Sequence, residues 1–543
     1  LCIPAAFMSD TGEVLDKKTP LLRSMDAINT QAMRILKLFG RTEVKRVVTT
    51  IGPEQEYFLI DRAMYDRRPD LIYTGRTLFG ARPPKGQELE DHYFGALKKR
   101  VSDFMRDLDE NLWKLGVLAK TEHNEVSPAQ HELAPIYNNT NVGTDHNQLT
   151  MEMLKKVAAE HGMVCLLHEK PFAGVNGSGK HNNWSIATDT GANLLEPGAS
   201  PSENAQFLLF LAAVIKAVDE HQDLLRISCA SAGNDHRLGA SEAPPAIISM
   251  FLGEELTEIV EALVAKATYC PKCKDEMDIG VAVLPRFFKD TTDRNRTSPF
   301  AFTGNKFEFR MVGSAFSVAD PNTVLNTIVA ESLRVFADRL EKAEDFNAEL
   351  NRLIRHTLRD HKRIIFNGNN YSDEWVAEAE SRGLLNWRSA AEAIPHLSDD
   401  KNIALFKQHN IFTEAEVRSR QEILLENYVK TITIEALTML DMVSRDILPA
   451  VLSYSGKLAQ SAGAKVALGI AVDAEKALCA KISALASGIA SASEALDAAL
   501  KNVPEEGVEA AAYTRNEVFS KMQALRAVVD EVEPLMPAKE WPY

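Results

Sequence analysis

Two segments of the chain alternate in a way that predicts β-strands with one charged face. Residues 51–58 place Glu54 and Glu56 on the same side of a predicted strand, because side chains alternate between the two faces of a sheet. A later alternation has the same character and consists of Lys306, Glu308 and Arg310. Flanking apolar residues such as Phe58 and Phe307 indicate that both faces are partly buried. Charges in such places need partners, because an unpaired buried carboxylate costs several kcal/mol.

Two further polar segments supply more candidate ligands. Pro128 breaks regular structure between Glu125 and Glu132, so that two adjoining segments can aim carboxylates at one point. A glycine-rich turn over residues 176–180 leads into another alternation, formed by His181, Asn183 and Ser185. Several carboxylates with one imidazole suit magnesium or manganese better than zinc, which favours thiolates and several histidines. The pattern therefore predicts a divalent metal site.

Each of these features has an ordinary alternative when taken alone. A pair such as Glu54 and Glu56 is more typical of a solvated strand face, and a single histidine such as His181 is more often a hydrogen-bonded core residue. Only the occurrence of all the segments in one chain favours a metal site.

Helical periodicity divides the chain into two regions. Up to about residue 320, glycine-rich turns and strand patterns alternate with helices such as 205–225, which predicts an α+β catalytic body. From residue 321 the chain reads as helical, over residues 324–343, 418–448 and an alanine-rich stretch from 462 to 500. Apolar residues in that stretch repeat in steps of four and three: Leu478, Ile482, Leu485, Ile489, Ala492, Leu496 and Ala499. This stripe predicts the seam of a helical hairpin or short coiled coil.

Composition limits the class of protein. With 543 residues and 45% hydrophobic residues, the chain can bury a large core and is expected to form two or three domains. A net charge of -15 argues against a sequence-independent nucleic-acid binder, which needs a basic surface. The longest apolar run, residues 207–214, is too short to span a bilayer. Cys270 and Cys273 form an isolated CxxC, more typical of two free thiols than of zinc. We expect a cytoplasmic enzyme that binds neither nucleic acid nor membrane.

Taken together, the polar segments resemble the active site of glutamine synthetases. The matching segments occur in the family's order and are GPEQEYF (52–58), EVSPAQHE (125–132), NGSGKH (176–181), NRT (295–297) and FEFR (307–310). The flanking phrases at residues 17–23, 238–248 and 293–302 are similar to the type III branch.

The resemblance implies an architecture. It predicts an α+β fold in which residues 1–340 form the catalytic domain, an incomplete β barrel with outer helices, and residues 341–543 form a C-terminal helical extension. Family members assemble as dodecamers of two hexameric rings with active sites between subunits. They usually carry an N-terminal domain whose loop supplies an aspartate to the ammonium pocket. That domain is not evident before Leu1, so the chain is expected to be a fragment.

The resemblance also assigns roles residue by residue. It implies two or three Mg²⁺ or Mn²⁺ ions, one held near the substrate by Glu56, Glu125 and Glu132 and another at the nucleotide phosphates by Glu54, His181 and Glu308. Residues that match the glutamate-binding positions are Asn176, Gly177, Arg237 and Arg310. Those that match nucleotide contacts are Asn183, Ser185 and Lys306. Glu242 matches a flap glutamate that shields the intermediate and accepts a proton from ammonium, and Arg296 is expected to neutralise charge during phosphoryl transfer.

The implied activity is ATP-dependent ligation of ammonia to L-glutamate through a γ-glutamyl phosphate. Two alternatives stay open at this point. One is a ligase that joins glutamate to an organic amine, and the other is an inactive structural or regulatory paralogue, which would be expected to have lost metal ligands.

Overall fold

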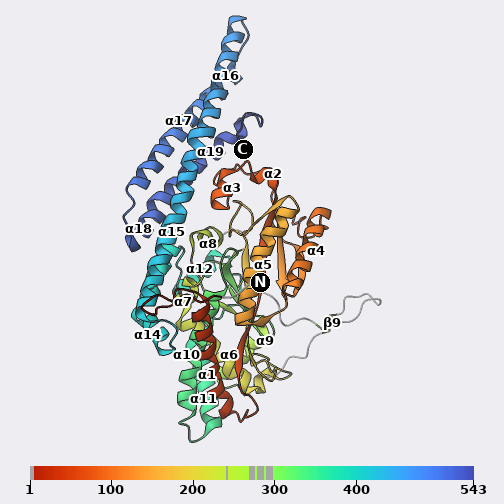
Figure 1. Cartoon of the computed structure of the whole chain (residues 1–543), viewed down its shortest axis with the longest axis vertical. Coiled ribbons are helices and arrows are strands. Elements are labelled where there is room, and N and C mark those ends of the chain that lie inside the picture. Colours follow the sequence, from red (N-terminus) through yellow and green to blue (C-terminus); the bar gives the residue numbers. More distant parts are fainter. Residues whose placement is uncertain (1–4, 240–242, 268, 270–275, 278–286, 289–296) are drawn as a thin grey trace.

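A compact body and a long helical arm make up the molecule (Figure 1). The computed structural model describes residues 5–239, 243–267, 269, 276–277, 287–288 and 297–543. The body contains the sheet and helices α1 to α14, and the arm contains α15 to α19. The predicted α+β class is therefore confirmed.

A nine-stranded mixed sheet forms the centre of the body. The main path of the sheet runs in the order β2 (Ala119–Asn124), β3 (Gln130–Pro135), β1 (Val47–Asp61), β6 (Gly179–Thr188), β11 (Phe307–Gly313), β10 (Phe300–Phe302) and β7 (Met250–Phe251). Two short strands, β4 (Asn138–Asn139) and β5 (Met163–Leu166), pair with different parts of β1. A separate pair is formed by β8 (Glu276–Met277) and β9 (Phe287–Phe288). The path does not close on itself among the described strands, as expected for an incomplete barrel.

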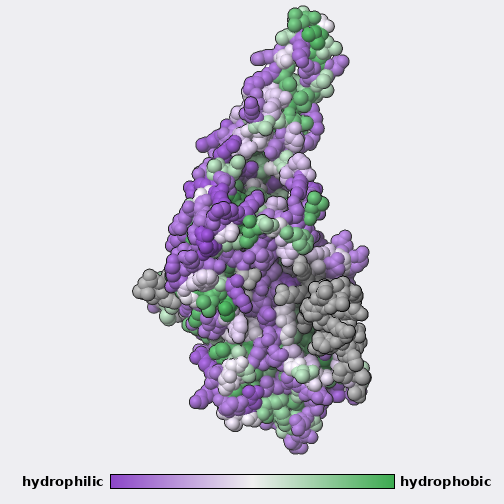
Figure 2. All heavy atoms as spheres, turned by 90° about the vertical axis from the view of Figure 1, so that its right-hand side faces the viewer, coloured by the Kyte–Doolittle hydropathy of each residue, from purple (hydrophilic) through white to green (hydrophobic). Residues whose placement is uncertain are grey.

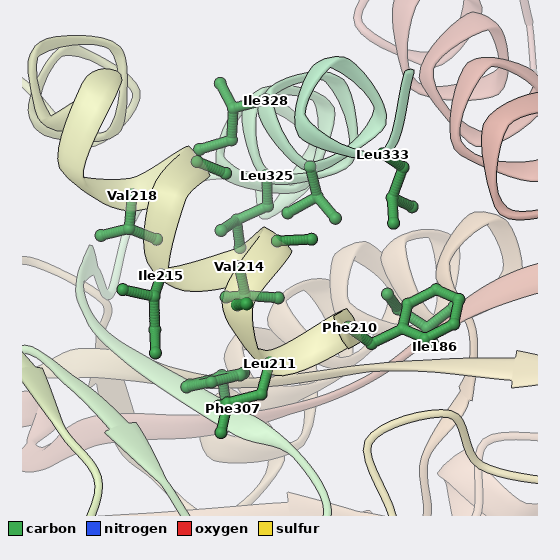
Figure 3. Packing of buried hydrophobic residues seen from close by; sticks show 14 of the residues in the cluster. Ile186, Phe210, Leu211, Val214, Ile215, Val218, Phe307, Leu325, Ile328 and Leu333 are labelled. Carbon is green, nitrogen blue, oxygen red and sulfur yellow. The ribbon is translucent and has the colours of Figure 1, made fainter. Parts of the chain in front are cut away.

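The main core lies between this sheet and a layer of helices (Figure 3). Helix α6 (Ala205–Glu220) carries the longest apolar run, and nearly all of its side chains are buried, as a helix that is apolar all round requires. Its Leu211 and Val214 lie between Phe307 of β11 and Leu325 of α10 (Ala319–Leu340). The single helix expected over 205–225 is two helices, because the chain bends at His221 before α7 (Gln222–Ile227).

The remaining helices of the body surround the sheet. Their bounds are α1 (Lys18–Leu38), α2 (Arg62–Tyr65), α3 (Pro69–Thr74), α4 (Lys99–Lys114), α5 (Thr140–Glu160), α8 (Ala232–Arg237), α9 (Glu254–Ala265), α11 (Phe346–His361), α12 (Asp373–Ser381), α13 (Ala390–Ala393) and α14 (Asp400–Gln408). Helices α4 and α5 cover a second, smaller core that includes Tyr57 and Leu133. Helices α11, α12 and α14 contribute to the main core.

The arm is built on one continuous rod. Helix α15 (Glu414–Met442) passes through a π-helical turn (Val443–Ile447) into α16 (Leu448–Ala467). After a turn, α17 (Asp473–Lys501) returns along the rod, followed by α18 (Gly507–Tyr513), a second π turn (Thr514–Val518) and α19 (Phe519–Val532). The alanine-rich stretch 462–500 is thus divided between α16 and α17, which pack against each other as a hairpin.

The predicted seam on α17 is confirmed. Ile482, Ile489 and Leu496 are fully buried, and α17 packs against both α16 and α19. At the tip of the arm the apolar side chains Val466, Leu468 and Ile470 are exposed, and Figure 2 shows apolar atoms gathered there. No helix in the described ranges combines the length and apolar character needed to cross a membrane.

Candidate active site

Neighbouring strands place polar side chains on one continuous face of the sheet. Cross-strand pairing joins Glu132 of β3 to His123 of β2 on one side and to Glu56 of β1 on the other. Glu54 of β1 pairs with His181 of β6. Directly opposed residues share a face, so their side chains are held within contact distance of one another. The charged strand face predicted around residues 54–56 therefore exists.

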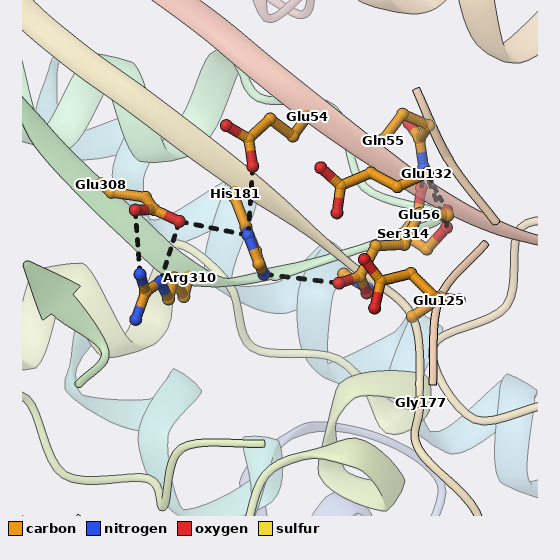
Figure 4. A network of polar contacts seen from close by, with 12 residues as sticks. Glu54, Gln55, Glu56, Glu125, Glu132, Gly177, His181, Glu308, Arg310 and Ser314 are labelled. Carbon is orange, nitrogen blue, oxygen red and sulfur yellow. Dashed lines mark hydrogen bonds and ion pairs between the residues drawn. The ribbon is translucent and has the colours of Figure 1, made fainter. Parts of the chain in front are cut away.

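His181 lies at the centre of this face (Figure 4). Its Nδ1 is 3.3 Å from Glu54 Oε2 and 3.1 Å from Glu308 Oε1, and its Nε2 is 3.4 Å from Glu56 Oε1. Burial alone would lower the pKa of His181, but its hydrogen bonds with Glu308 and Glu54 raise the pKa well above its usual value. Burial likewise raises the pKa of Glu54, and here the hydrogen bond and charge of His181 outweigh it, so the pKa is lowered. This end of the face is electrostatically balanced.

At the other end of the face, around Glu125 and Glu132, the negative charges are not neutralised. Burial and the negative charge of Glu56 raise the pKa of Glu125. Burial also raises the pKa of Glu132 well above its ordinary value, and the charges of Glu54, Glu56 and Glu125 raise it further. His123 is the nearby base, with Nδ1 3.7 Å from Glu125 Oε1 and Nε2 4.0 Å from Glu132 Oε1. A cation at this end would remove the electrostatic penalty.

The donor atoms fit divalent metal ions. Three groups each offer ligand atoms within 4.8 Å of one another, and they are Glu54, His181 and Glu308; Glu56, Glu132 and His181; and His123, Glu125 and Glu132. The first group consists of the three residues expected to hold a metal ion at the nucleotide phosphates. The expected substrate-side triad is divided between the other two groups, because Glu125 lies in the loop beyond β2 whereas Glu132 lies on β3.

Two arginines lie beside this carboxylate face. Arg310 of β11 donates from Nε and Nη2 to the two oxygens of Glu308, at 2.9 and 3.0 Å. Arg237, at the end of α8, donates to the carbonyl of Arg310 at 3.0 Å. A Cβ at Gly179 would lie 2.5 Å from Arg237 Cζ, so only glycine allows this guanidinium to approach the strand. Both arginines are buried and line the same cavity as the carboxylates.

The glycine-rich turn is fixed by two glutamines. Gln87 donates from Nε2 to Asn176 Oδ1 at 2.6 Å and accepts from the Asn176 backbone N–H at 2.8 Å. Gln130 donates to the carbonyl of Gly177 at 2.8 Å. The turn therefore presents Asn176 and Gly177 to the cavity in a defined orientation.

A cavity of about 480 Å³ collects most of the predicted residues. Its lining includes Glu54, Glu56, Glu125, Glu132, Asn176, Gly177, His181, Arg237, Glu308 and Arg310. The predicted nucleotide contacts are not among its lining residues. Asn183 donates to Glu54 Oε1 at 2.8 Å, and the Ser185 hydroxyl donates to the carbonyl of Asn305 at 2.8 Å. Lys306 is half-buried immediately before β11.

Four predicted residues lie outside the described ranges, namely Glu242, Arg296, Cys270 and Cys273. Ala243 and Pro244, which follow Glu242 in the chain, line the cavity.

Sequence reasoning missed several residues of the site. His123 is two positions from Glu125, and this spacing could have suggested a shared ligand group. Gln87 and Tyr371 reach the site from loops far away in the sequence, and no local pattern distinguishes them.

The chain is similar to known proteins over most or all of its length. The family model described as the glutamine synthetase catalytic domain matches residues 31–248, and that of the glutamine synthetase C-terminal domain matches residues 349–465. A protein named type-3 glutamine synthetase from Dictyostelium discoideum is 47% identical over 556 residues, covering 100% of this chain and 75% of its own length. A glutamine synthetase from Butyrivibrio fibrisolvens is 48% identical, covering 100% of this chain and 78% of its own length. One from Bacteroides fragilis is 45% identical over 85% of this chain and 64% of its own length.

Proposed function

The chain belongs to the glutamine synthetase family, in its type III branch, and from this premise we propose that it ligates ammonia to L-glutamate with hydrolysis of ATP. The observation that carries the proposal is the convergence of five glutamates and His181 on one cavity that two buried arginines also line. An inactive paralogue would have no reason to keep carboxylates whose crowding destabilises the metal-free protein.

The reaction must convert a poor electrophile into a reactive one. ATP phosphorylates the side-chain carboxylate of glutamate, and ammonia then displaces phosphate from the resulting acyl phosphate. Phosphoryl transfer depends on positioning and charge neutralisation rather than on covalent help from the protein. The residues of the cavity therefore have to hold two anionic substrates close together.

We propose that two or three Mg²⁺ or Mn²⁺ ions supply this neutralisation when bound. Glu54, His181 and Glu308 would hold one ion, and Glu56, Glu125 and Glu132 would hold another, with His123 beside the last two carboxylates. Bound ions polarise phosphoryl oxygens and offset the charge that develops on them.

Glutamate would be oriented by the chain itself. Arg310 and Arg237 line the cavity, and their positive charges favour them as anchors for the substrate carboxylates. Asn176 and Gly177, held by Gln87 and Gln130, would contact the amino-acid part. We propose Asn183, Ser185 and Lys306 as nucleotide contacts.

Glu242 and Arg296 are proposed as the catalytic side chains. A loop that closes over the site would exclude water, which would otherwise hydrolyse the acyl phosphate. Glu242 would then take a proton from ammonium, and Arg296 would stabilise the transferring phosphoryl group.

Further features are proposals that rest on the family. We propose a dodecamer of two hexameric rings, with sites completed by neighbouring subunits, and a cytoplasmic location. The division into a catalytic domain (1–340) and a helical extension (341–543) is also proposed; within the extension, α11, α12 and α14 pack in the main core of the body and the arm begins at α15.

Phosphate release from full-length protein tests the activity. With glutamate, ATP and magnesium, ammonium is expected to stimulate release and a primary amine such as methylamine is not. Glu242→Ala and Arg296→Ala are expected to lower turnover about 100- to 1000-fold, because each removes one charge-stabilising group, while Mn²⁺ binding is kept. Exposed Glu254 on α9 provides a matched control, and Glu254→Ala should keep normal turnover. Equal stimulation by methylamine would favour the organic-amine alternative, and unchanged rates in both variants would refute the roles assigned.

A further inference from the structure

A second cavity lies between the body and the arm. It has a volume of about 400 Å³ and shares no lining residue with the catalytic cavity. Helix α8 of the body contributes Asp235 and His236, and α15 and α19 of the arm contribute Ile432, Met439 and Phe519. The wall is therefore part polar and part apolar.

Most charges around this second cavity are paired with one another. Arg76 donates from Nε and Nη2 to the two oxygens of Glu435, at 2.7 and 2.6 Å. Arg526 donates to Asp530 Oδ2 at 3.0 Å. The Asp235 carboxylate accepts from the backbone N–H of Ala390, at 2.8 and 2.9 Å. These groups need no further partner.

Two groups on the wall are different. Arg515 lies in the π turn before α19 and stacks its guanidinium 4.9 Å from the centre of the Phe519 ring, but in the described part of the chain it makes no hydrogen bond and no ion pair. His236 Nε2 is buried and has no hydrogen-bond partner among the described residues, since Glu435 Oε2 is 3.8 Å away and beyond hydrogen-bond distance. A buried polar atom without a partner, such as His236 Nε2, is uncommon in a folded protein, and π turns such as the one that carries Arg515 are frequent at functional sites.

We propose that this second cavity binds a small organic anion. Its carboxylate or phosphate group would accept hydrogen bonds from Arg515 and His236, and its apolar part would pack against Phe519, Ile432 and Met439. Arg76 and Arg526 are paired with carboxylates, and Lys170 donates to the carbonyl of Val175. Arg515 is therefore the lining cation that makes no hydrogen bond among the described residues, so the anion carries a single small head group. A cavity of this size and mixed lining is typical of small-molecule sites.

The second cavity is linked to the catalytic cavity through the backbone. Asp235 and His236 face the second cavity, whereas Arg237, the next residue of α8, faces the catalytic one. Lys170 lines the second cavity and donates to the carbonyl of Val175, immediately before Asn176. A ligand that shifts these segments is expected to change the affinity for glutamate, a consequence that rests on the proposed function.

Direct binding tests the site without reference to catalysis. Benzoate and phenyl phosphate are titrated against the whole chain by ligand-observed NMR with metals chelated, and benzyl alcohol serves as the uncharged match. We expect saturable binding of at least one anion in the millimolar range, no comparable binding of the alcohol, and binding about tenfold or more weaker in Arg515→Met. This substitution keeps an apolar stem and breaks no hydrogen bond among the residues that the structure describes.

Arg445 lies in the other π turn, is exposed and does not line the second cavity, so Arg445→Met should bind as the wild type does. Absence of binding by both anions, or equal binding in wild type and Arg515→Met, would overturn the proposal.

A kinetic measurement tests the link separately. Saturating phenyl phosphate is expected to change the KM for glutamate about fivefold or more in the wild type and to leave it unchanged in Arg515→Met. Binding without a change in KM would reject the link but keep the site. If phenyl phosphate binds but the protein shows no turnover, the proposed function is rejected and the second binding site is kept.

Discussion

Replacing Glu122 by glutamine is expected to stabilise the protein, and the gain should grow as the pH rises. Glu122 lies on β2, and both its carboxylate oxygens are buried with no hydrogen-bond partner in the described ranges. Burial, with a contribution from the nearby charge of Asp109, raises the pKa of Glu122 to about 9. The hydroxyl of Tyr57, which the charge of Asp109 also affects, likewise has no hydrogen-bond partner among the described residues. The folded protein therefore carries Glu122 in its protonated form at neutral pH.

The size of the effect follows from the two pKa values. The unfolded side chain titrates near 4.5 and the folded one near 9, so the proton favours folding below pH 4.5 and this contribution is lost as the pH rises toward 9. At pH 7 the folded chain holds a proton that the unfolded chain has released, at a cost of about 3 kcal/mol. A buried amide that lacks partners offsets about 1 to 2 kcal/mol of the gain. We therefore expect a net stabilisation of about 1 to 2 kcal/mol at pH 7 that rises by about 2.7 kcal/mol between pH 6 and pH 8.

Unfolding of the wild type and of Glu122→Gln by urea and by heat at several pH values measures how this stability difference changes with pH. Glu110 lies on the exposed side of α4 near Asp109, and Glu110→Gln should change stability by less than about 0.5 kcal/mol at every pH. Infrared spectroscopy should show a protonated carboxyl band in the wild type that Glu122→Gln lacks. A stability difference that does not vary with pH would refute the argument, because it would mean that Glu122 is ionised in the folded protein.

Three further predictions concern the site and the arm. Gly179→Ala should raise the KM for glutamate about tenfold or more with metal binding kept, because its methyl group would displace the Arg237 guanidinium; Gly456→Ala, with open space around its Cβ, is the control. His123→Gln should weaken Mn²⁺ binding about 10- to 100-fold in calorimetric titration, and an unchanged affinity would remove His123 from the metal site. Ile489→Ala in the arm seam should cost about 2 to 5 kcal/mol of stability and speed proteolysis of the arm, whereas equal proteolysis rates would contradict the packing role.

Part of the site could be predicted because its ligands follow strand periodicity. Glu54 and Glu56 are two residues apart on β1, as are Glu308 and Arg310 on β11, so the sequence alone places each pair on one face. The break at Pro128 similarly indicated that Glu125 and Glu132 come from adjoining segments.

How these segments meet could not be predicted from local pattern. The sharing of His181 between two ligand groups depends on the register of β6 against β1, and the proximity of His123 to Glu132 depends on the register of β2 against β3. Gln87, which orients Asn176, reaches the site from a loop whose sequence has no periodicity.

Helical patterns behaved in a similar way in the arm. The stripe on α17 was visible because its buried residues recur with the helix period, and the structure buries Ile482, Ile489 and Leu496 as expected. The break after Ala467 in the arm and the break at His221 in the body were not visible, because tertiary packing rather than propensity decides where these helices end.

The sequence by itself determined the chemical types at the site, the faces of the strands and helices that carry them, and the resemblance to one enzyme family. Only the tertiary structure decided which carboxylates share a cation, which arginines are already paired, and that a second cavity lies where the arm meets the body. The physical reason is that side-chain direction along a strand or helix is a local property with a fixed period. Distances between elements depend on register and packing, which contacts over the whole chain determine together.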